Sequence, residues 1–394
     1  MANNNENKIL NVPNLRFPEF CGEWVTKSIN DLAVVIGGGT PDTTVKSYWD
    51  GEIQWFTPSE IGKNKYVDSS LRTITEVGLN NSSAKLLPPN TILLSSRATI
   101  GECSLSLREC ATNQGFQCLV SKKCNVDFLY YLIQTKKKDL IRKSCGSTFL
   151  EISANEVRKI QVSVPSDVEQ QKIAELLSLI DERIATQNKI IEKLQSLIKG
   201  LNNTLQYDTG GKSVCLGDIL LERSERSQTN NQHEVLSSTV KGIFSQREYF
   251  SKDIASENNV GYKIIRLHDV VLSPQNLWMG NINYNDRFEI GIVSPSYKVF
   301  SIADGYDNQF VAAMLKTHRA LYSYMMVSEQ GASIVRRNLN MEAFSQLVFK
   351  IPSLDKQREI GYAISLLKSQ LKTANKIIKA YTSQKQYLPR QMFI

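Results

Sequence analysis

The residue types that carry most enzymatic chemistry do not form working patterns along this chain. The segment Gly211-Lys212-Ser213 ends like a phosphate-binding loop, but Gln206 stands where the first glycine of that motif belongs. The three histidines, His233, His268 and His318, lie too far apart in the sequence to predict a metal site. We therefore expect neither a nucleotide-binding loop nor a metal centre from these residues.

Two other segments come close to catalytic motifs and are better explained otherwise. Asp167 and Glu169, with Lys172 nearby, resemble a nuclease carboxylate cluster. They stand where an extended run meets a long helical pattern, however, and acidic residues there favour a helix N-terminus. The order Pro88-Pro-Asn90 reverses the asparagine-first motif of an amino-methyltransferase. We interpret the chain as non-catalytic, and we expect no metal and no cofactor on it.

Other polar side chains in expected loops are of types that contact DNA. Arg97 follows an apolar run, where its guanidinium could reach guanine or phosphate, and an internal ion pair is the alternative. Asn113 and Gln114 could bond to an adenine edge, although the sequence Asn-Gln-Gly also favours a turn. Lys63 and Lys65 belong to a basic loop that suits either phosphate contact or simple solvation.

A pair of arginines in the second half completes these candidates. Arg336 and Arg337 follow the segment Gly331-Ala-Ser, and we expect one of them to touch DNA. The chain of 394 residues carries a formal net charge of +8, which permits a polyanionic partner without demanding one. The seven cysteines form no Cys-x-x-Cys pair, which favours reduced thiols and a cytoplasmic protein. We expect no membrane-spanning segment and no membrane partner.

The elements that must position these residues are organised by a long repeat. The segment 165–205 recurs 187 positions later as the segment 352–392, and each copy has the order Pro-x-x-x-x-Gln followed by an apolar heptad stripe. The stripe of the first copy contains Ile173, Leu177, Ile180, Ile184, Ile191, Leu194 and Ile198, and that of the second contains Ile360, Ile364, Leu367, Leu371 and Ile378. A sustained period of about 3.5 residues predicts a coiled coil. The two copies can therefore pair with each other.

Polar residues interrupt both stripes. Gln187 in the first stripe suits either a register-fixing core position or a solvent-facing bend. Lys385 in the second stripe predicts looser pairing at that end. In the second copy Lys356 also replaces the glutamate of the first copy, Glu169.

The segments between the helices predict two mixed domains of strands and helices. Short β-type runs at 33–36, 53–56, 91–94, 117–120 and 160–164 surround one expected helix at 126–143, and a similar order follows a polar break at 206–212. A second helix is expected at 308–326. We therefore expect an α+β protein with these parts: an arm (1–20), a first domain (21–165), a central helix (166–206), a second domain (207–352) and a C-terminal helix (353–394).

The motifs and their order resemble the specificity subunit of a type I DNA restriction-modification system. The first half has Arg16-Phe-Pro-Glu-Phe20, Gly38-Gly-Thr-Pro41, Ser95-Ser-Arg97-Ala-Thr-Ile-Gly101 and Thr112-Asn-Gln-Gly-Phe116. The second half has Asp269-Val-Val-Leu-Ser-Pro, Trp278-Met-Gly280 and Val293-Ser-Pro-Ser-Tyr297. Each motif alone is weak, and their order and duplication carry the resemblance.

This resemblance implies a chain that reads double-stranded DNA and leaves the chemistry to its partners. Each half would hold one target-recognition domain for one part of a split, asymmetric site, and the two helices would pack antiparallel as a spacer of about 50 Å. The partners would be two methyltransferase subunits, and through them nuclease and translocase subunits. S-adenosylmethionine, ATP and magnesium would bind to those partners. The alternative hypothesis is a coiled-coil scaffold or assembly protein without DNA specificity.

Overall fold

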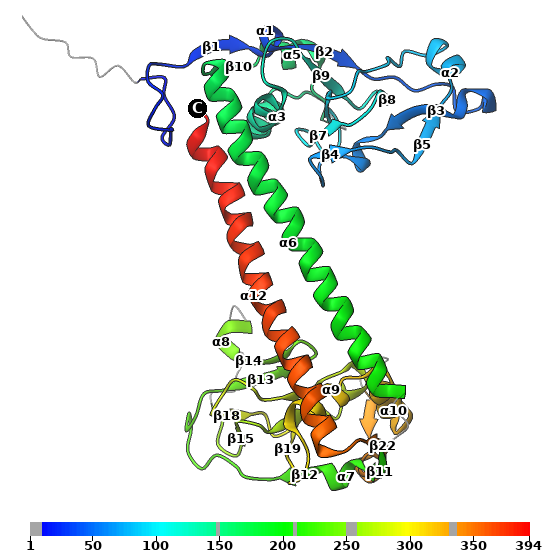
Figure 1. Cartoon of the computed structure of the whole chain (residues 1–394), viewed down its shortest axis with the longest axis vertical. Coiled ribbons are helices and arrows are strands. Elements are labelled where there is room, and N and C mark those ends of the chain that lie inside the picture. Colours follow the sequence, from blue (N-terminus) through cyan, green and yellow to red (C-terminus); the bar gives the residue numbers. More distant parts are fainter. Residues whose placement is uncertain (1–9, 147–149, 208–210, 250–257, 331–336) are drawn as a thin grey trace, which may run out of the picture. The chain divides into compact units, whose positions relative to one another are not determined.

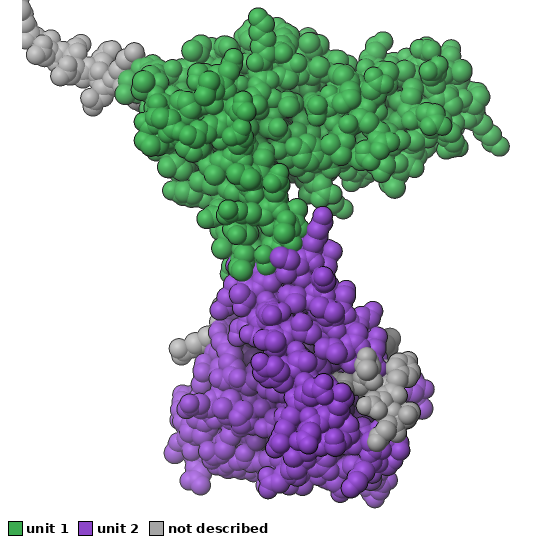
Figure 2. Space-filling view, viewed as in Figure 1, with its two compact units in different colours: residues 1–188, 377–394 green, residues 189–376 purple. Residues whose placement is uncertain are grey.

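The structure is a computed structural model that describes residues 10–146, 150–207, 211–249, 258–330 and 337–394. The chain divides into two compact units, residues 1–188 with 377–394 and residues 189–376 (Figure 2). The long helices α6 (Asp167–Tyr207) and α12 (Leu354–Met392) each contribute to both units. The repeat read from the sequence is therefore a repeat of long helices.

Unit 1 is built on a five-stranded sheet. Its strand order is β2 (Ala33–Gly37), β9 (Gln117–Ser121), β6 (Ile92–Leu94), β7 (Cys103–Ser106) and β4 (Tyr66–Val67). The apolar runs form these strands because their side chains are buried on both faces, as Ile92, Leu93 and Leu94 show. The helix α3 (Val126–Thr135) packs its apolar residues, Phe128 among them, into the same core (Figure 1).

A second, three-stranded sheet of unit 1 has the order β5 (Arg72–Ile74), β3 (Trp49–Phe56) and β8 (Cys110–Thr112). The 3₁₀ turns η1 (Lys46–Tyr48) and η2 (Pro58–Glu60) flank β3, and the helix α2 (Glu76–Asn80) follows β5. Strands β3 and β8 are parallel, with Phe56 opposite Thr112, so their carboxyl ends lie at one edge of the sheet. A separate core of Trp49, Trp55 and Ile74 supports this sheet.

Unit 2 repeats the central part of unit 1. The sheet order β12 (Leu220–Arg223), β19 (Lys298–Ile302), β16 (Val270–Leu272) and β17 (Ile282–Tyr284) matches β2, β9, β6 and β7. A two-stranded ladder precedes each long helix: β1 (Val25–Ser28) with β10 (Gln161–Val164), and β11 (Lys212–Cys215) with β22 (Val348–Ile351). Short helices follow β1 and β11 and precede β10 and β22: α1 (Ile29–Leu32), α7 (Leu216–Ile219), α5 (Ala154–Lys159) and α11 (Met341–Ser345). We call these shared elements, with the long helices, the repeated frame.

Unit 2 carries its own additions to the repeated frame. They are the ladders β13 (Leu236–Thr239) with β14 (Gly242–Ser245), β15 (Lys263–Arg266) with β18 (Ile290–Val293), and β20 (Ser328–Gln330) with β21 (Arg337–Leu339), together with α8 (Gln246–Tyr249) and η3 (Leu277–Met279). The pairing of these strands differs in part from that in unit 1. There β3 pairs antiparallel with β5 and parallel with β8, whereas β13 pairs antiparallel with β14, and one parallel bridge joins Val235 to Ile292 of β18.

The expected domain helices are each interrupted. The predicted helix 126–143 is α3 followed by α4 (Lys137–Arg142), with the break at Lys136. The predicted helix 308–326 is α9 (Asn308–Met314) followed by α10 (His318–Met326). A new N-cap starts α10, since the Thr317 side chain accepts a hydrogen bond from Ala320 N. A continuous helix is therefore wrong in both halves.

The predicted fold class is confirmed, because α6 and α12 pair antiparallel (Figure 1). Within unit 1, Leu177 and Ile180 near the start of α6 line the same hollow as Lys385 near the end of α12. Within unit 2, Ile198 of α6 and Leu371 of α12 share another hollow. Every predicted stripe residue is buried or half-buried.

The two polar interruptions of the stripe lie inside the packing. Gln187 is only 9% exposed, so its side chain is turned away from solvent. Lys385 Nζ lies 2.6 Å from Asp181 Oδ1, and Tyr131 donates a hydrogen bond to Asp181 Oδ2 at 2.7 Å. Lys385 therefore links the two helices within unit 1 instead of leaving the expected loose contact.

Candidate nucleic-acid interface

The glutamine of the first Pro-x-x-x-x-Gln motif joins the long helix α6 to the domain helix α3. Gln170 is buried, and its Nε2 donates to Pro165 O at 3.1 Å. Its Oε1 accepts from Asn125 N at 3.1 Å. Asn125 is the N-cap of α3, and its side chain accepts from Phe128 N. One carboxamide thus fixes where α3 starts relative to α6.

The second motif repeats this arrangement residue for residue in unit 2. Gln357 Nε2 donates to Pro352 O at 2.9 Å, and its Oε1 accepts from Asp307 N at 3.0 Å. Asp307 is the N-cap of α9 and accepts from Phe310 N. The motif requires glutamine because only a carboxamide donates and accepts at this reach. The repeated frame therefore holds each domain on the helices in the same way.

Replacing either glutamine with leucine is expected to lower the free energy of unfolding by about 2 kcal/mol, because buried backbone groups lose their partners. Gln170→Leu would leave Asn125 N without this acceptor, and Gln357→Leu would do the same to Asp307 N. The control is Gln171→Leu, an exposed neighbour with a predicted change near zero. Urea denaturation of the three variants measures this, and equal stability of all three would contradict the assignment.

The N-terminal arm is clamped onto the start of α6. Arg16 donates from Nε to Glu169 Oε1 at 2.8 Å and from Nη2 to Glu169 Oε2 at 2.7 Å. Trp24 Nε1 donates to the same carboxylate at 3.3 Å, and Glu169 is 1% exposed. These hydrogen bonds raise the pKa of the Arg16 guanidinium above its ordinary value. Glu169 is therefore a structural anchor in this unit.

The first group of predicted DNA contacts lies together in unit 1. Arg97 forms an ion pair with Glu151, with Nε 2.8 Å from Oε1. The internal ion pair that was the alternative to DNA contact is therefore present. Asn113 Oδ1 accepts from Gly115 N at 2.9 Å, a hydrogen bond that belongs to the turn expected as the alternative for this segment. Gln114 is exposed and its Oε1 accepts from the Thr40 hydroxyl. Contact of these side chains with DNA stays a prediction.

The same turn lies beside the loop that carries Arg97. Ser96 N donates to Gly115 O at 2.8 Å, which brings the two loops together. Gly38 packs against this turn so closely that a Cβ there would lie 1.9 Å from Asn113 O. The loops at 38–40, 96–97 and 113–115 therefore form one compact group.

The remaining predicted contacts are separate from that group. Lys63 is exposed. The Lys65 side chain is 7% exposed, with Nζ 2.6 Å from Asp127 Oδ1 and 2.7 Å from Ser178 Oγ, so its charge is engaged within unit 1. Arg336 lies outside the described residues. Arg337 donates to Met325 O and Ser328 O at 3.3 Å and lies over the Trp278 ring.

Sequence reasoning missed two cations with unusual surroundings. Arg72 stacks on Trp49, with Cζ 3.5 Å from the ring centroid. Lys316 donates to Gly280 O at 3.0 Å and to Asn283 Oδ1 at 2.7 Å, and burial lowers its pKa to about 8. Nothing beside Arg72 in the sequence marks this stacking, because Trp49 lies on the neighbouring strand β3. Nothing local marks Lys316 as buried.

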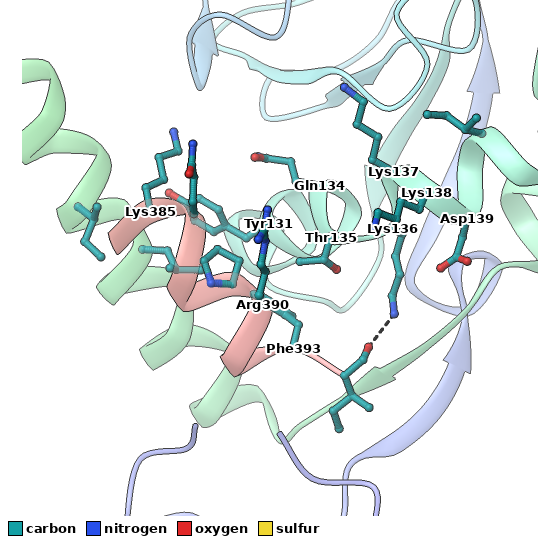
Figure 3. Close-up of a pocket in the computed structure, with 16 residues that line it drawn as sticks. Tyr131, Gln134, Thr135, Lys136, Lys137, Lys138, Asp139, Lys385, Arg390 and Phe393 are labelled. Atoms are coloured by element: carbon teal, nitrogen blue, oxygen red, sulfur yellow. Dashed lines mark hydrogen bonds between the residues drawn. The ribbon is translucent and has the colours of Figure 1, made fainter. Parts of the chain in front are cut away.

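A basic hollow of about 780 Å³ lies in unit 1 where α3 and α4 meet the end of α12 (Figure 3). Its walls include Lys136, Lys138 and Arg390, and Leu177 and Ile180 are among its apolar residues. Lys136 donates to the Ile394 carbonyl at 2.6 Å, drawn as the dashed line in Figure 3, and burial lowers the pKa of Lys136. The residues that line the hollow combine apolar side chains with cations.

Several cysteines of unit 1 are buried in its cores. Burial raises the pKa of the Cys103, Cys110 and Cys118 thiols to about 12, so they are not poised as nucleophiles. Among the residues that the structure describes, no group of three or more His, Cys, Asp or Glu side chains is placed to hold a metal ion. None of the described helices combines the length and apolarity of a membrane span.

Comparison with known proteins identifies similar sequences. The family model for the type I restriction modification DNA specificity domain matches residues 22–196. The MjaIX specificity subunit of Methanocaldococcus jannaschii is 40% identical over 279 residues, which cover 64% of this chain and 64% of that protein. The EcoR124I/EcoR124II specificity subunit of Escherichia coli is 30% identical over 201 residues, covering 49% and 48%. The chain thus spans about two thirds and about half of these two relatives.

Solved structures share the fold over almost the whole chain. A type I restriction-modification system S subunit from M. genitalium superposes with a TM-score of 0.62, covering 97% of this chain and 99% of that one at 16% identity. A chain from a structural study of complex assembly and conformational transition of the type I R-M system gives a TM-score of 0.53 at 12% identity, covering 94% and 96%. At these identities the likeness concerns the fold.

Proposed function

Because this chain belongs to the type I restriction-modification specificity subunits, we propose that it reads a bipartite, asymmetric DNA sequence and directs partner subunits to it. The chain would be the non-catalytic subunit of the complex. Its partners would be two methyltransferase subunits, and through them the nuclease and translocase subunits. S-adenosylmethionine, ATP and magnesium would then act on those partners, in the cytoplasm.

One observation carries the proposal: a repeated frame bears two unlike additions at the same place in the chain order. Between the first two strands of the frame, β2 and β6, unit 1 inserts β3, β4, β5 and α2, with the turns η1 and η2. Between β12 and β16, unit 2 inserts β13, β14, α8 and β15 instead. Two equal surfaces would suit a symmetric site, whereas two unlike surfaces suit one that is split and asymmetric.

The repeated frame supports the proposal of two methyltransferase subunits. Both glutamine junctions share two hydrogen bonds, so a single kind of partner would find two similar places to dock. The arm clamp differs, because Lys356 stands in unit 2 where Glu169 stands in unit 1 and pairs with Glu359 on its own helix. The two docking places would therefore be similar without being identical.

The test is methylation mapping in cells that express the partner methyltransferase with or without this chain. We expect methylated adenines in one split sequence only when the chain is present. The purified complex should bind that sequence at least about a thousandfold more tightly than scrambled DNA, with affinity falling as salt rises. An unchanged methylation pattern, or equal binding to both DNAs, would leave the scaffold hypothesis standing.

A further inference from the structure

The three-stranded sheet of unit 1 gathers exposed side chains at one edge. The parallel strands β3 and β8 both end there, and Arg72 of β5 lies opposite Trp55 near the end of β3. Gln114 follows the end of β8, and Leu71 precedes β5. Leu71, Arg72 and Gln114 therefore belong to the same edge, which we call the β3–β8 edge.

Leu71 is an exposed apolar residue whose backbone is ordered by hydrogen bonds. Its side chain is 87% exposed, the largest fraction among the exposed large hydrophobic residues that the structure describes. Leu71 N donates to Glu60 Oε1 at 2.7 Å. The hydroxyl of the preceding residue, Ser70, accepts from Trp55 N at 2.9 Å and donates to Arg72 O at 2.6 Å. Because these hydrogen bonds order the backbone, little backbone entropy is lost when a partner covers Leu71.

The Arg72 guanidinium stacks on a tryptophan ring. Its guanidinium stacks 3.5 Å above the buried Trp49, whose ring meets Trp55 edge-on at 5.1 Å between centroids. Within the part of the chain that the structure describes, no carboxylate pairs with Arg72. Stacking fixes the plane of the guanidinium while its N–H groups stay available at the rim. This is the geometry for bidentate bonding to a planar acceptor pair.

Gln114 adds an oriented amide to the same edge. The Thr40 hydroxyl donates to Gln114 Oε1, which leaves Nε2 as the outward donor. The Glu60 carboxylate is engaged within unit 1, because it accepts from Thr57 N at 2.8 Å as well as from Leu71 N. The edge therefore offers donors and an apolar group to a partner.

These groups match the chemistry of base edges in a DNA groove. Arginine bonds guanine O6 and N7, glutamine bonds adenine, and an apolar side chain covers the thymine methyl group. The two units insert different elements between the first two strands of the repeated frame, so side chains carried by these elements suit information specific to one half-site. A protein partner that docks on both halves would instead use the repeated frame. We propose that Leu71 and Arg72, with Gln114 beside them, read bases in one half of the split DNA site.

This proposal rests on the proposed function, and its test uses the full chain assembled with its methyltransferase partner. The variants are Arg72→Gln and Leu71→Ser, with Arg142→Gln as a control that removes another exposed charge, from the helix α4. Binding to a library of split sites gives the preference at each base. Thermal unfolding by circular dichroism verifies folding, which Leu71→Ser should leave unchanged because the side chain is exposed.

We expect Arg72→Gln to reduce discrimination on the order of ten- to a hundredfold at one or two positions of one half-site, with the other half unaffected. Leu71→Ser should weaken the preference in that same half, and Arg142→Gln should change neither half. Unchanged preferences, or a weakening that is uniform over all sequences, would overturn base reading by this edge. Loss of methyltransferase assembly with intact preference would assign the edge to a protein partner and overturn it too.

The outcome separates the two proposals. If the unaltered complex prefers no sequence, the proposed function fails. If the unaltered complex prefers one split site and the edge variants keep that preference, only the role of the β3–β8 edge fails.

Discussion

Replacing both Ile180 and Leu194 with aspartate is expected to unfold the helix pair and abolish assembly with the methyltransferase partner. Both side chains are buried, with exposed fractions of 7% and 9%. Each replacement removes buried apolar volume and puts a carboxylate in its place, at a cost of about 3–5 kcal/mol. The sum is comparable with the whole stability of a typical domain. Urea denaturation and size-exclusion chromatography of the assembled complex measure the two effects.

The same helix supplies a matched control for this prediction. Leu179 and Leu197 are neighbours of the seam residues in sequence, and their side chains are 54% and 47% exposed. Leu179→Asp with Leu197→Asp therefore adds the same two charges outside the seam, at an expected cost below about 1 kcal/mol. If the seam variant assembled normally and its complex methylated the same sequence, our placement of the seam would be wrong.

The fold class could be predicted because its signal is periodic and occurs twice. An apolar stripe sustained from Ile173 to Ile198 can be satisfied only by a matching stripe, and the second copy supplies one. The glutamines were visible for the same reason, as a motif repeated at a fixed shift. Their hydrogen-bond role was not visible, because the partner of Gln170 is Asn125, 45 residues away.

The interruptions of the domain helices could not be predicted from periodicity. The apolar face of 126–143 is continuous in sequence, and the break at Lys136 coincides with a tertiary contact from that side chain to the Ile394 carbonyl. Tertiary contacts of this kind override helix propensity. Lys137 and Lys138, which begin α4 after the break, line the basic hollow.

Residue type alone did not predict which of the candidate DNA-contacting cations have partners within the protein. Lys65 and Lys63 belong to one basic loop, yet Lys65 is engaged with Asp127 and Ser178, the latter 113 residues away. Arg72 lacked any local mark, because its significance depends on stacking over Trp49 across the sheet. Charge and loop position therefore select candidates, whereas long-range partners decide which cations remain available.

Replacing Arg16 with alanine is expected to lower the free energy of unfolding by about 3–5 kcal/mol, because it leaves the Glu169 carboxylate buried without its partner. The side chains of Arg16 and Glu169 are 16% and 2% exposed, so solvent cannot compensate the charge. Of the three side-chain hydrogen bonds described for this carboxylate, the one from Trp24 Nε1 at 3.3 Å remains when Arg16 is replaced. Thermal unfolding of the full chain measures the loss.

Two further variants distinguish a stranded charge from lost packing. Arg16→Ala with Glu169→Gln removes the charge as well as its partner, and it should regain part of the stability that Arg16→Ala loses. Lys356→Ala alters the position that corresponds to Glu169 in the second copy, where Lys356 pairs with Glu359 on the surface, and it should cost below about 1 kcal/mol. If Arg16→Ala were as mild as Lys356→Ala, the arm would not be anchored by this ion pair. The difference between the two junctions would then have to reside in other contacts, since the glutamine bonds are common to both.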